Sequence, residues 1–277
     1  MIPLGEDIIT VKLTFDLELF PSLTPAQETN RILSQAVDDI LLPLERNSIK
    51  ATLFVTGKFA ELFPDIVKRA SLAGHEIGNH TMNHQPIRMV TLRQYIEDVE
   101  SCHNLIKKLT GQVPVGFRGP MGNIPMDIAR FLCPMGYRYD SSICRTYIPG
   151  WYEGGLGPED PYFPNLDNIR IESNAQKQFI EIPIGTFSIL PIPLGGFFLS
   201  SLPLLDKSMM NMCNDEHNHV IFLHPLDLVH GRELKPHIWE RLRSGSRVKS
   251  TLMKLAKMNA DSDMRLQSVA FSNLANE

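Results

Sequence analysis

The sequence lacks an apolar run long enough to cross a membrane. A spanning helix needs about 20 consecutive apolar residues, and the longest apolar stretch, at positions 187–205, is interrupted by three prolines and two glycines. This composition favours a loop packed on the core. The first residues also lack a basic segment followed by an apolar one, so we expect no secretory signal and a cytoplasmic protein.

Cysteine is scarce, and its spacing is uninformative. The chain has four cysteines, none in CxxC spacing. A disulfide framework and a cysteine-rich zinc site are therefore disfavoured, and we expect buried, reduced thiols.

A basic surplus is also absent. The 277 residues include 27 Lys and Arg against 31 Asp and Glu, which gives a net charge of −4 and argues against a nucleic-acid binder. Residues 232–257 form a basic segment that could touch anionic lipid headgroups, but a solvated surface helix is the favoured interpretation. A homo-oligomer is compatible with the sequence.

Strand-like and helical segments alternate along the chain. Apolar, β-branched runs predict strands at 7–15, 50–57, 75–80, 113–118, 137–142, 178–185 and 219–226. Helical periodicity predicts helices at 24–44, 58–74 (interrupted at Pro64), 91–109, 125–136, 204–214 and 233–258. Residues 145–177 are rich in Gly, Pro and Asn and predict long loops that could cover a site.

This alternation predicts one α/β domain over residues 1–277, with parallel strands and right-handed crossovers. The pattern alone leaves a barrel and an open sheet as alternatives. In both architectures, functional residues lie at the carboxyl ends of the strands. Four predicted strand ends carry acids, imidazoles or a guanidinium: Asp16 and Glu18, His80 and His84, Arg118, and His224 with Asp227. We expect a common centre.

The spacing of these residues favours a metal site. Asp16 and Glu18 are two apart on a strand, so they share a face and repel each other unless a cation or a proton separates them. His80 and His84 are four apart, which would place them on one face of a helical turn. Two imidazoles and one carboxylate suit a hydrolytic zinc site. Each motif alone also fits a solvated polar turn. His75 begins its strand and is left out.

The remaining strand-end residues suit acyl-transfer chemistry. Arg118 could bridge two loops, but beside two acids it would hold one of them ionised and oriented. Gly119, Pro120 and Gly122 indicate a tight turn whose N–H groups could bind an oxyanion. His224, at a separate strand end, suits a proton donor to a leaving group.

Taken together, these segments resemble the polysaccharide deacetylase family, the NodB-like carbohydrate esterases of family 4. That family carries T-F-D-D-G, H-[ST]-x-x-H, R-x-P-x-G, an Asp-containing fourth motif and L-x-H, in this order. HTMNH matches the second motif, RGPMG the third, and LHP at Leu223 and His224 the fifth. TFDLE resembles the F-D-x-[DE] variant of a subgroup of bacterial deacetylases. The resemblance covers about residues 10–230.

The resemblance implies a distorted, seven-stranded (β/α) TIM-like barrel with a metal-dependent amidase site. Asp16 would be the general base, oriented by Arg118. His80, His84 and Glu18 would ligate a divalent metal. Zinc is the first expectation, and Co, Mn, Fe or Ni would also suit these ligands.

The resemblance also implies the residues around the substrate. His224 would protonate the departing amine, the N–H of Met121 would stabilise the oxyanion, and Leu223 would line a pocket for the acetyl methyl group.

The fourth motif lacks its usual Trp. We expect Asp140 to lie near the substrate, where it could tune the pKa of His224. Asp227 could tune this pKa instead. Trp151 could cover a sugar ring.

The predicted enzyme is therefore a metal-dependent hydrolase that releases acetate from an N-acetylated amino sugar or glycan precursor. Alternatives on the same fold are a deformylase or deacetylase of a lipid-linked sugar and an allantoinase-like amidase of a non-sugar substrate. A pseudoenzyme that binds without catalysis is less favoured because no ligand or base is clearly lost. A structural zinc site is disfavoured because no cysteine lies near these motifs.

Overall fold

Eight parallel strands form the main sheet of the computed structural model, which describes residues 10–19, 26–146, 157–187, 192–201, 219–229, 245–261 and 265–267. The strands are β1 (Thr10–Leu17), β2 (Thr52–Val55), β3 (Glu76–Asn79), β4 (Gly116–Phe117), β5 (Tyr139–Asp140), β8 (Ile180–Glu181), β9 (His219–Leu223) and β10 (Arg265–Gln267). The pairing runs in the order β10-β1-β2-β3-β4-β5-β8, with β9 also beside β1.

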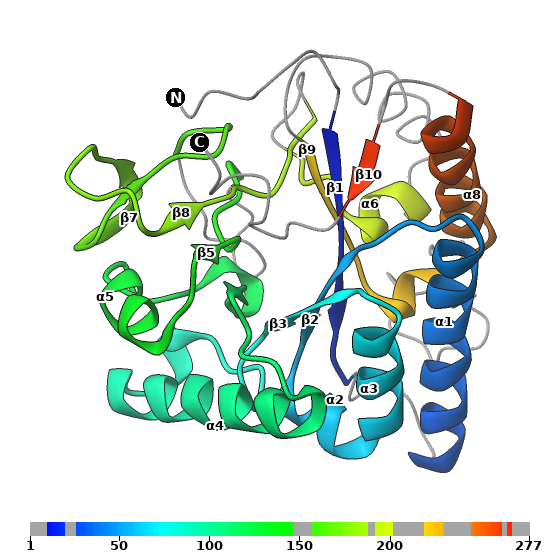
Figure 1. Cartoon of the computed structure of the whole chain (residues 1–277), viewed down its shortest axis with the longest axis horizontal. Coiled ribbons are helices and arrows are strands. Elements are labelled where there is room, and N and C mark those ends of the chain that lie inside the picture. Colours follow the sequence, from blue (N-terminus) through cyan, green and yellow to red (C-terminus); the bar gives the residue numbers. More distant parts are fainter. Residues whose placement is uncertain are drawn as a thin grey trace.

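Strand β1 is the centre of this sheet (Figure 1). Residues Val11–Phe15 pair with β9, Thr14–Leu17 with β2, and Thr10–Lys12 with β10. Because the β9 pairing overlaps both of the others, β9 must occupy one edge of β1, while β2 and β10 share the other edge.

Backbone hydrogen bonds connect the far end of the sheet to β9. The N–H of Gly185, just after β8, donates to the carbonyl of Val220 at 3.0 Å, and Phe222 N–H donates to Leu194 at 3.1 Å. Strands β1, β2, β3, β4, β5, β8 and β9 thereby curl into the distorted (β/α) barrel that the family resemblance implied.

Helices cover the outside of this barrel. They are α1 (Ala26–Arg46), α2 (Gly57–Leu62), α3 (Pro64–Leu72), α4 (Leu92–Thr110), α5 (Ala129–Leu132), α6 (Gly196–Ser201) and α8 (Gly245–Asp261). Short 3₁₀ turns lie at Ile87–Met89, Pro120–Gly122, Cys133–Met135 and Pro225–Leu228. Helices α1 and α8 contact each other on one side of the sheet (Figure 1). Within the described residues, no helix combines the length and apolar character needed to cross a membrane.

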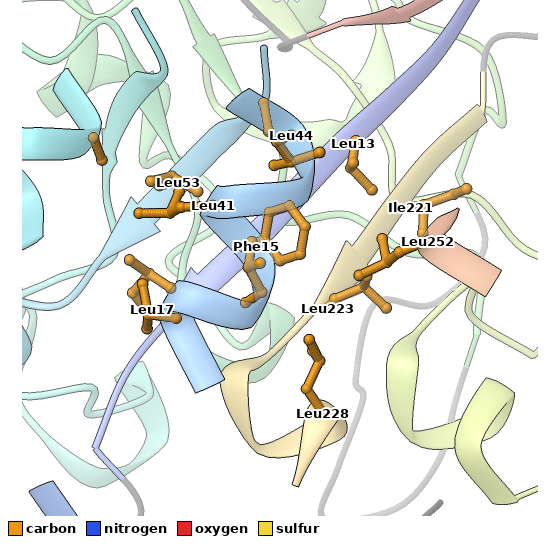
Figure 2. Packing of buried hydrophobic residues seen from close by; sticks show 14 of the residues in the cluster. Leu13, Phe15, Leu17, Leu41, Leu44, Leu53, Ile221, Leu223, Leu228 and Leu252 are labelled. Carbon is orange, nitrogen blue, oxygen red and sulfur yellow. The ribbon is translucent and has the colours of Figure 1, made fainter. Parts of the chain in front are cut away.

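Alternation along β1 separates the core from the site. Leu13, Phe15 and Leu17 are fully buried in the apolar layer between the sheet and the helices (Figure 2). Successive side chains of a strand point to opposite faces, so Thr14 and Asp16 point into the barrel. The polar residues of β1 are therefore held inside by the apolar residues that alternate with them.

Local sequence signals explain several helix boundaries. Thr91 caps α4, and its side chain and that of Gln94 form the reciprocal hydrogen bonds of a capping box. Gly111 ends this helix with a φ of 74°. The predicted break at Pro64 is also present, because α2 ends at Leu62 and α3 begins at the proline.

Other elements differ from the prediction. Residues 164–172 were predicted as loop but form an antiparallel hairpin of β6 (Pro164–Asn165) and β7 (Asn168–Glu172). The apolar stretch predicted as loop contains α6, and β10 was not predicted. These elements have two to six residues, too few for a period to stand out. The predicted helix at 204–214 and the first part of the one at 233–258 lie outside the described residues.

Candidate metal centre and catalytic residues

Strand β1 delivers two carboxylates to one end of the barrel. Asp16 is the last inward-facing residue of β1, and Glu18 follows it two positions later. Both are buried, with 4% and 6% of their surface exposed. Leu17, between them, lies in the apolar layer on the other side (Figure 2). The shared face predicted from their spacing is thus present.

The three predicted metal ligands lie together. Glu18, His80 and His84 each offer one ligand atom, and these atoms lie within 4.8 Å of one another. Oε2 of Glu18 is 2.6 Å from Nε2 of His84, and the two imidazole centroids are 4.9 Å apart. Burial raises the pKa of Glu18, but the adjacent His84 outweighs this and lowers it to about 2, so the carboxylate is ionised at neutral pH.

The hydrogen bonding of His80 leaves one nitrogen available. Its Nδ1 lies 2.6 Å from the carbonyl oxygen of Arg118. A carbonyl can only accept, so Nδ1 carries the proton and Nε2 presents a lone pair. Burial lowers the pKa of His80 to about 4, which keeps the ring neutral.

A buried, unpartnered nitrogen of this cluster fits a metal. Within the described part of the chain, Nε2 of His80 is buried without a hydrogen-bond partner. An unsatisfied buried acceptor is costly. A divalent cation would satisfy this atom, with the Glu18 carboxylate close enough to be a second ligand, and the bond from His80 Nδ1 to a carbonyl is the usual support of a metal-bound imidazole. The residues present therefore fit the implied metal.

His80 and His84 lie on a loop, so the prediction that they share a helical turn is wrong. Residues 80–84 follow β3 without helical structure, and Thr81 and His84 have φ angles of 65° and 55°. Left-handed residues of this kind cost free energy and are found where the surroundings enforce them. The two imidazoles approach each other because this loop turns sharply.

Asp98 of α4 enforces that loop conformation. Its Oδ2 accepts hydrogen bonds from the backbone N–H groups of Met82 and Asn83, both at 3.0 Å. Asn79 helps from the other side, because its Oδ1 accepts the N–H of Thr81 at 2.8 Å. Sequence analysis missed Asp98, which carries no motif and becomes visible only when α4 packs beside β3.

Arg118 contacts Asp16 directly. Nη1 of Arg118 donates to Oδ1 of Asp16 and to the hydroxyl of Thr14, both at 2.8 Å. Nε donates to the carbonyl of Ser141 at 2.8 Å, and the guanidinium lies 4.2 Å from the ring centroid of Phe54. With 2% of its surface exposed, Arg118 is a fixed cation that holds one oxygen of Asp16.

His224 of the predicted proton-donor position faces both acids. Its Nε2 lies 3.6 Å from Oε1 of Glu18 and 3.9 Å from Oδ2 of Asp16. Nδ1 lies 3.4 Å from Oδ2 of Asp227, which also accepts the backbone N–H of His224 at 2.7 Å. Burial lowers the pKa of His224, but Asp227 and the two acids outweigh it and raise the pKa to about 9.

Asp140 has a different place from the one predicted. Its carboxylate accepts hydrogen bonds from the hydroxyl of Ser142 at 2.6 Å and from the N–H of Ser142 at 3.2 Å. Asp140 has no exposed surface, so it cannot contact a substrate in this conformation. The residue beside His224 is Asp227, and Asp140 instead lies next to Glu181.

Leu223 also points away from the site, which corrects the predicted pocket role. It packs with Leu17 and Leu228 in the layer between sheet and helices (Figure 2). Residues two apart on β9 share a face, so Phe222 shares an orientation with His224, and their ring centroids are 5.6 Å apart. The L-x-H motif places its apolar residue two positions before the histidine, which is the position of Phe222 here.

The remaining predicted residues are partly placed. Met121 has a φ of 56° within the turn at Pro120–Gly122, in line with a strained turn near the site. Trp151 lies outside the described residues. His75 is buried at the start of β3, where its Nδ1 accepts the N–H of Ala51 at 3.2 Å, and it is not part of the metal cluster.

Comparison with known sequences matches the part of the chain that carries the first three motifs. The sequence profile of the polysaccharide deacetylases matches residues 6–139. A peptidoglycan-N-acetylglucosamine deacetylase of Bacillus cereus is 39% identical over 85 residues, which cover 31% of this chain and 31% of that protein. The match therefore spans about a third of the length of this relative.

Solved structures share the fold over nearly the whole chain. A Mycobacterium smegmatis protein assigned to the polysaccharide deacetylases gives a TM-score of 0.68 at 17% identity, covering 96% of this chain and 89% of that one. A family 4 carbohydrate esterase pseudoenzyme of Bacillus anthracis gives 0.55 at 13% identity, covering 94% and 64%. At these identities the likeness shows the fold alone. Together with the profile match, it confirms the resemblance to the polysaccharide deacetylases that the motifs predicted.

Proposed function

We propose that this protein is a metal-dependent hydrolase that removes the acetyl group from an N-acetylated amino sugar of a glycan. The observation that carries the proposal is the convergence of three side-chain groups at one barrel end. These are the ligand cluster of Glu18, His80 and His84, the Asp16–Arg118 pair and His224.

The metal would be held by Glu18, His80 and His84. When bound, a divalent cation of this kind polarises an amide carbonyl and lowers the pKa of a water molecule. Three protein ligands leave positions open for both. Zinc remains our first expectation, and other divalent transition metals suit the same ligand set.

The protein supplies the proton transfers. Asp16 would accept the proton of the attacking water, and Arg118 orients that carboxylate through its hydrogen bond to Oδ1. His224 would deliver a proton to the departing amine, and its contact with Asp227 fixes the ring. Because Nε2 of His224 faces Oδ2 of Asp16 at 3.9 Å, base and acid border the same space.

The names of the relatives support the substrate class. The Bacillus cereus relative is a peptidoglycan-N-acetylglucosamine deacetylase, and a Bacillus subtilis protein 29% identical over 130 residues is a peptidoglycan-N-acetylmuramic acid deacetylase. Both names describe hydrolysis of an acetamide on a glycan sugar. We extend this class, and not a particular sugar, to the present chain.

The proposal is tested by metal analysis together with amine release from a panel of N-acetyl and N-formyl sugars. We expect one divalent metal ion per chain and amine release by the wild type. Asp16→Asn should bind metal but lose at least about 100-fold in kcat, because general base catalysis contributes roughly 10²–10⁴-fold. His80→Ala should lose the metal. Asp65→Asn, an exposed change on α3, is the matched control and should behave like the wild type.

The outcomes separate the parts of the proposal. Metal binding without amine release from any sugar would make the chain a binding protein on this fold. Full metal content in His80→Ala would show that the ligand assignment is wrong. Release of formate but not acetate would replace deacetylation by deformylation.

A further inference from the structure

A second pair of acids lies buried near Arg118, outside the metal cluster. Asp140 on β5 and Glu181 on β8 are register partners in the sheet, and neither has exposed surface. Two adjacent carboxylates cannot both be ionised in a buried site, since each charge raises the pKa of the other. Burial raises the pKa of both groups, and the neighbouring acid raises that of Glu181 further.

The hydrogen bonds show which acid holds the proton. Asp140 already accepts two hydrogen bonds from Ser142, which favours its ionised form. Oε1 of Glu181 accepts the N–H of Ile143 at 3.0 Å, whereas Oε2 is buried without a partner among the described residues. A proton on Oε2, donated to Asp140, would satisfy this atom. The Arg118 charge favours the ionised form of both acids and so does not decide between them. Burial raises the pKa of the Tyr95 and Tyr162 phenols, which stay neutral.

Ser142 connects this pair to the catalytic loop. Its hydroxyl donates to Asp140 at 2.6 Å and therefore accepts the N–H of Gly119 at 2.7 Å. Gly119 is tightly enclosed, because a Cβ there would lie 1.9 Å from Cγ2 of Ile124. A polar chain thus runs from Glu181 through Asp140 and Ser142 to the residue that follows Arg118.

Arg118 is tied to the same segment. Its Nε donates to the carbonyl of Ser141 and its Nη2 to the hydroxyl of Ser141, at 2.8 and 2.9 Å. The carbonyl of Arg118 accepts the Nδ1 proton of His80. A shift of the 141–142 segment would therefore move both the partner of Asp16 and the support of a metal ligand.

We propose that Asp140 and Glu181 share one proton and act as a positioning pair, which holds the Arg118–Gly119 segment in place through Ser142. The role deepens the proposed hydrolase and rests on it for its effect on catalysis. Neither residue of the pair touches the substrate.

Two isosteric changes test the pair because they should have opposite effects. In Glu181→Gln, the amide N–H takes the place of the shared proton, so kcat and zinc affinity should stay within about twofold of the wild type. In Asp140→Asn, the amide places a donor where the donors of Ser142 and Glu181 already point. We expect about a tenfold lower kcat at saturating metal with little change in KM, and about a tenfold weaker zinc affinity.

Infrared spectroscopy gives a readout that needs no activity. The wild type at neutral pH should show the C=O stretching band of a protonated carboxyl, and Glu181→Gln should remove it. The exposed change Glu61→Gln is the control and should leave band, kcat and zinc affinity unchanged. If Asp140→Asn does not fold, Ser142→Ala tests the same chain with both acids present and should lower kcat and zinc affinity in the same direction.

The outcomes are distinguishable from failure of the proposed function. If the wild type releases no amine, the proposed hydrolase function is overturned. The infrared band and the zinc affinities would still show whether Asp140 and Glu181 form the positioning pair. Absence of the band, equal losses in both isosteric variants, or wild-type values in Asp140→Asn and Ser142→Ala would each overturn the positioning pair.

Discussion

Asp98 shows how one side chain outside the motifs can set the geometry of the metal ligands. Its carboxylate accepts hydrogen bonds from the backbone N–H groups of Met82 and Asn83, which lie in the loop between His80 and His84. Without these bonds the left-handed angles of the loop lose their support.

Replacing this carboxylate should therefore weaken metal binding. We expect Asp98→Ala to lower zinc affinity about tenfold, the lower end of the effect of removing supporting partners of metal ligands. Isothermal titration calorimetry of the metal-free protein with zinc measures this. Glu97→Ala, the exposed neighbour on the same helix, is the control. Equal affinities of the two variants would show that the loop holds its shape without Asp98.

Single residues also mark the limit of what motifs predict. The spacing of Asp16 and Glu18 predicted their common face because alternation on a strand is local. Leu223 was assigned by matching LHP to the L-x-H motif of the family. Strand alternation instead places it on the opposite face from His224, with Phe222 beside the site. Asp98 and Glu181 could not be found, because their roles depend on packing between elements distant in sequence.

At the scale of elements, α4 links local sequence to the site. Its capping box at Thr91 fixes where the helix begins, and from that start Asp98 faces the histidine loop. Tyr95, Val99, Cys102 and Ile106 form the buried side of the helix, with the spacing of one helical stripe.

Loss of the cap should destabilise the protein by a local amount. Thr91→Ala removes the acceptor for the Gln94 N–H and should lower the free energy of unfolding by about 1 kcal/mol. Urea denaturation measures the change. Ser101→Ala is the control on the same helix, because the Ser101 hydroxyl bonds only to the preceding turn. If Thr91→Ala lowers the free energy of unfolding no more than Ser101→Ala does, the role of the cap is contradicted.

Elements with strong local signals were predicted, and those built by pairing were not. Local sequence signals predicted the helix α4, the break at Pro64 and the buried β9: helical periodicity, a proline and an apolar run, respectively. The three residues of β10 become a strand only because the first half of β1 offers them an edge. The hairpin of β6 and β7 likewise depends on the pairing of two short segments.

At the scale of the whole molecule, the raised pKa of Glu181 predicts how stability depends on pH. A carboxyl whose pKa is higher in the folded state stabilises the fold fully below its ordinary value of 4.5, and this contribution is lost as the pH rises through the folded value. Gln does not titrate. The stability of Glu181→Gln relative to the wild type should therefore increase with pH above about 4.5.

Urea denaturation of both proteins at a series of pH values measures this difference. Taking the difference cancels separate titrating groups such as Glu76, whose pKa burial also raises, whereas Asp140 is part of the same titrating pair as Glu181. A difference that stays constant with pH would show that Glu181 has the same pKa folded and unfolded.

The central position of β1 has a consequence for how the chain folds during its synthesis. The strand that carries Asp16 is synthesised well before β9 and β10, which pair with its edges and are separated from it by about 200 residues of sequence or more. Until those partners arrive, β1 presents unpaired backbone groups, and His224 is absent from the site. The candidate site is therefore completed only after β9 is made, and a chain stalled before β9 would expose an aggregation-prone strand edge without a complete site.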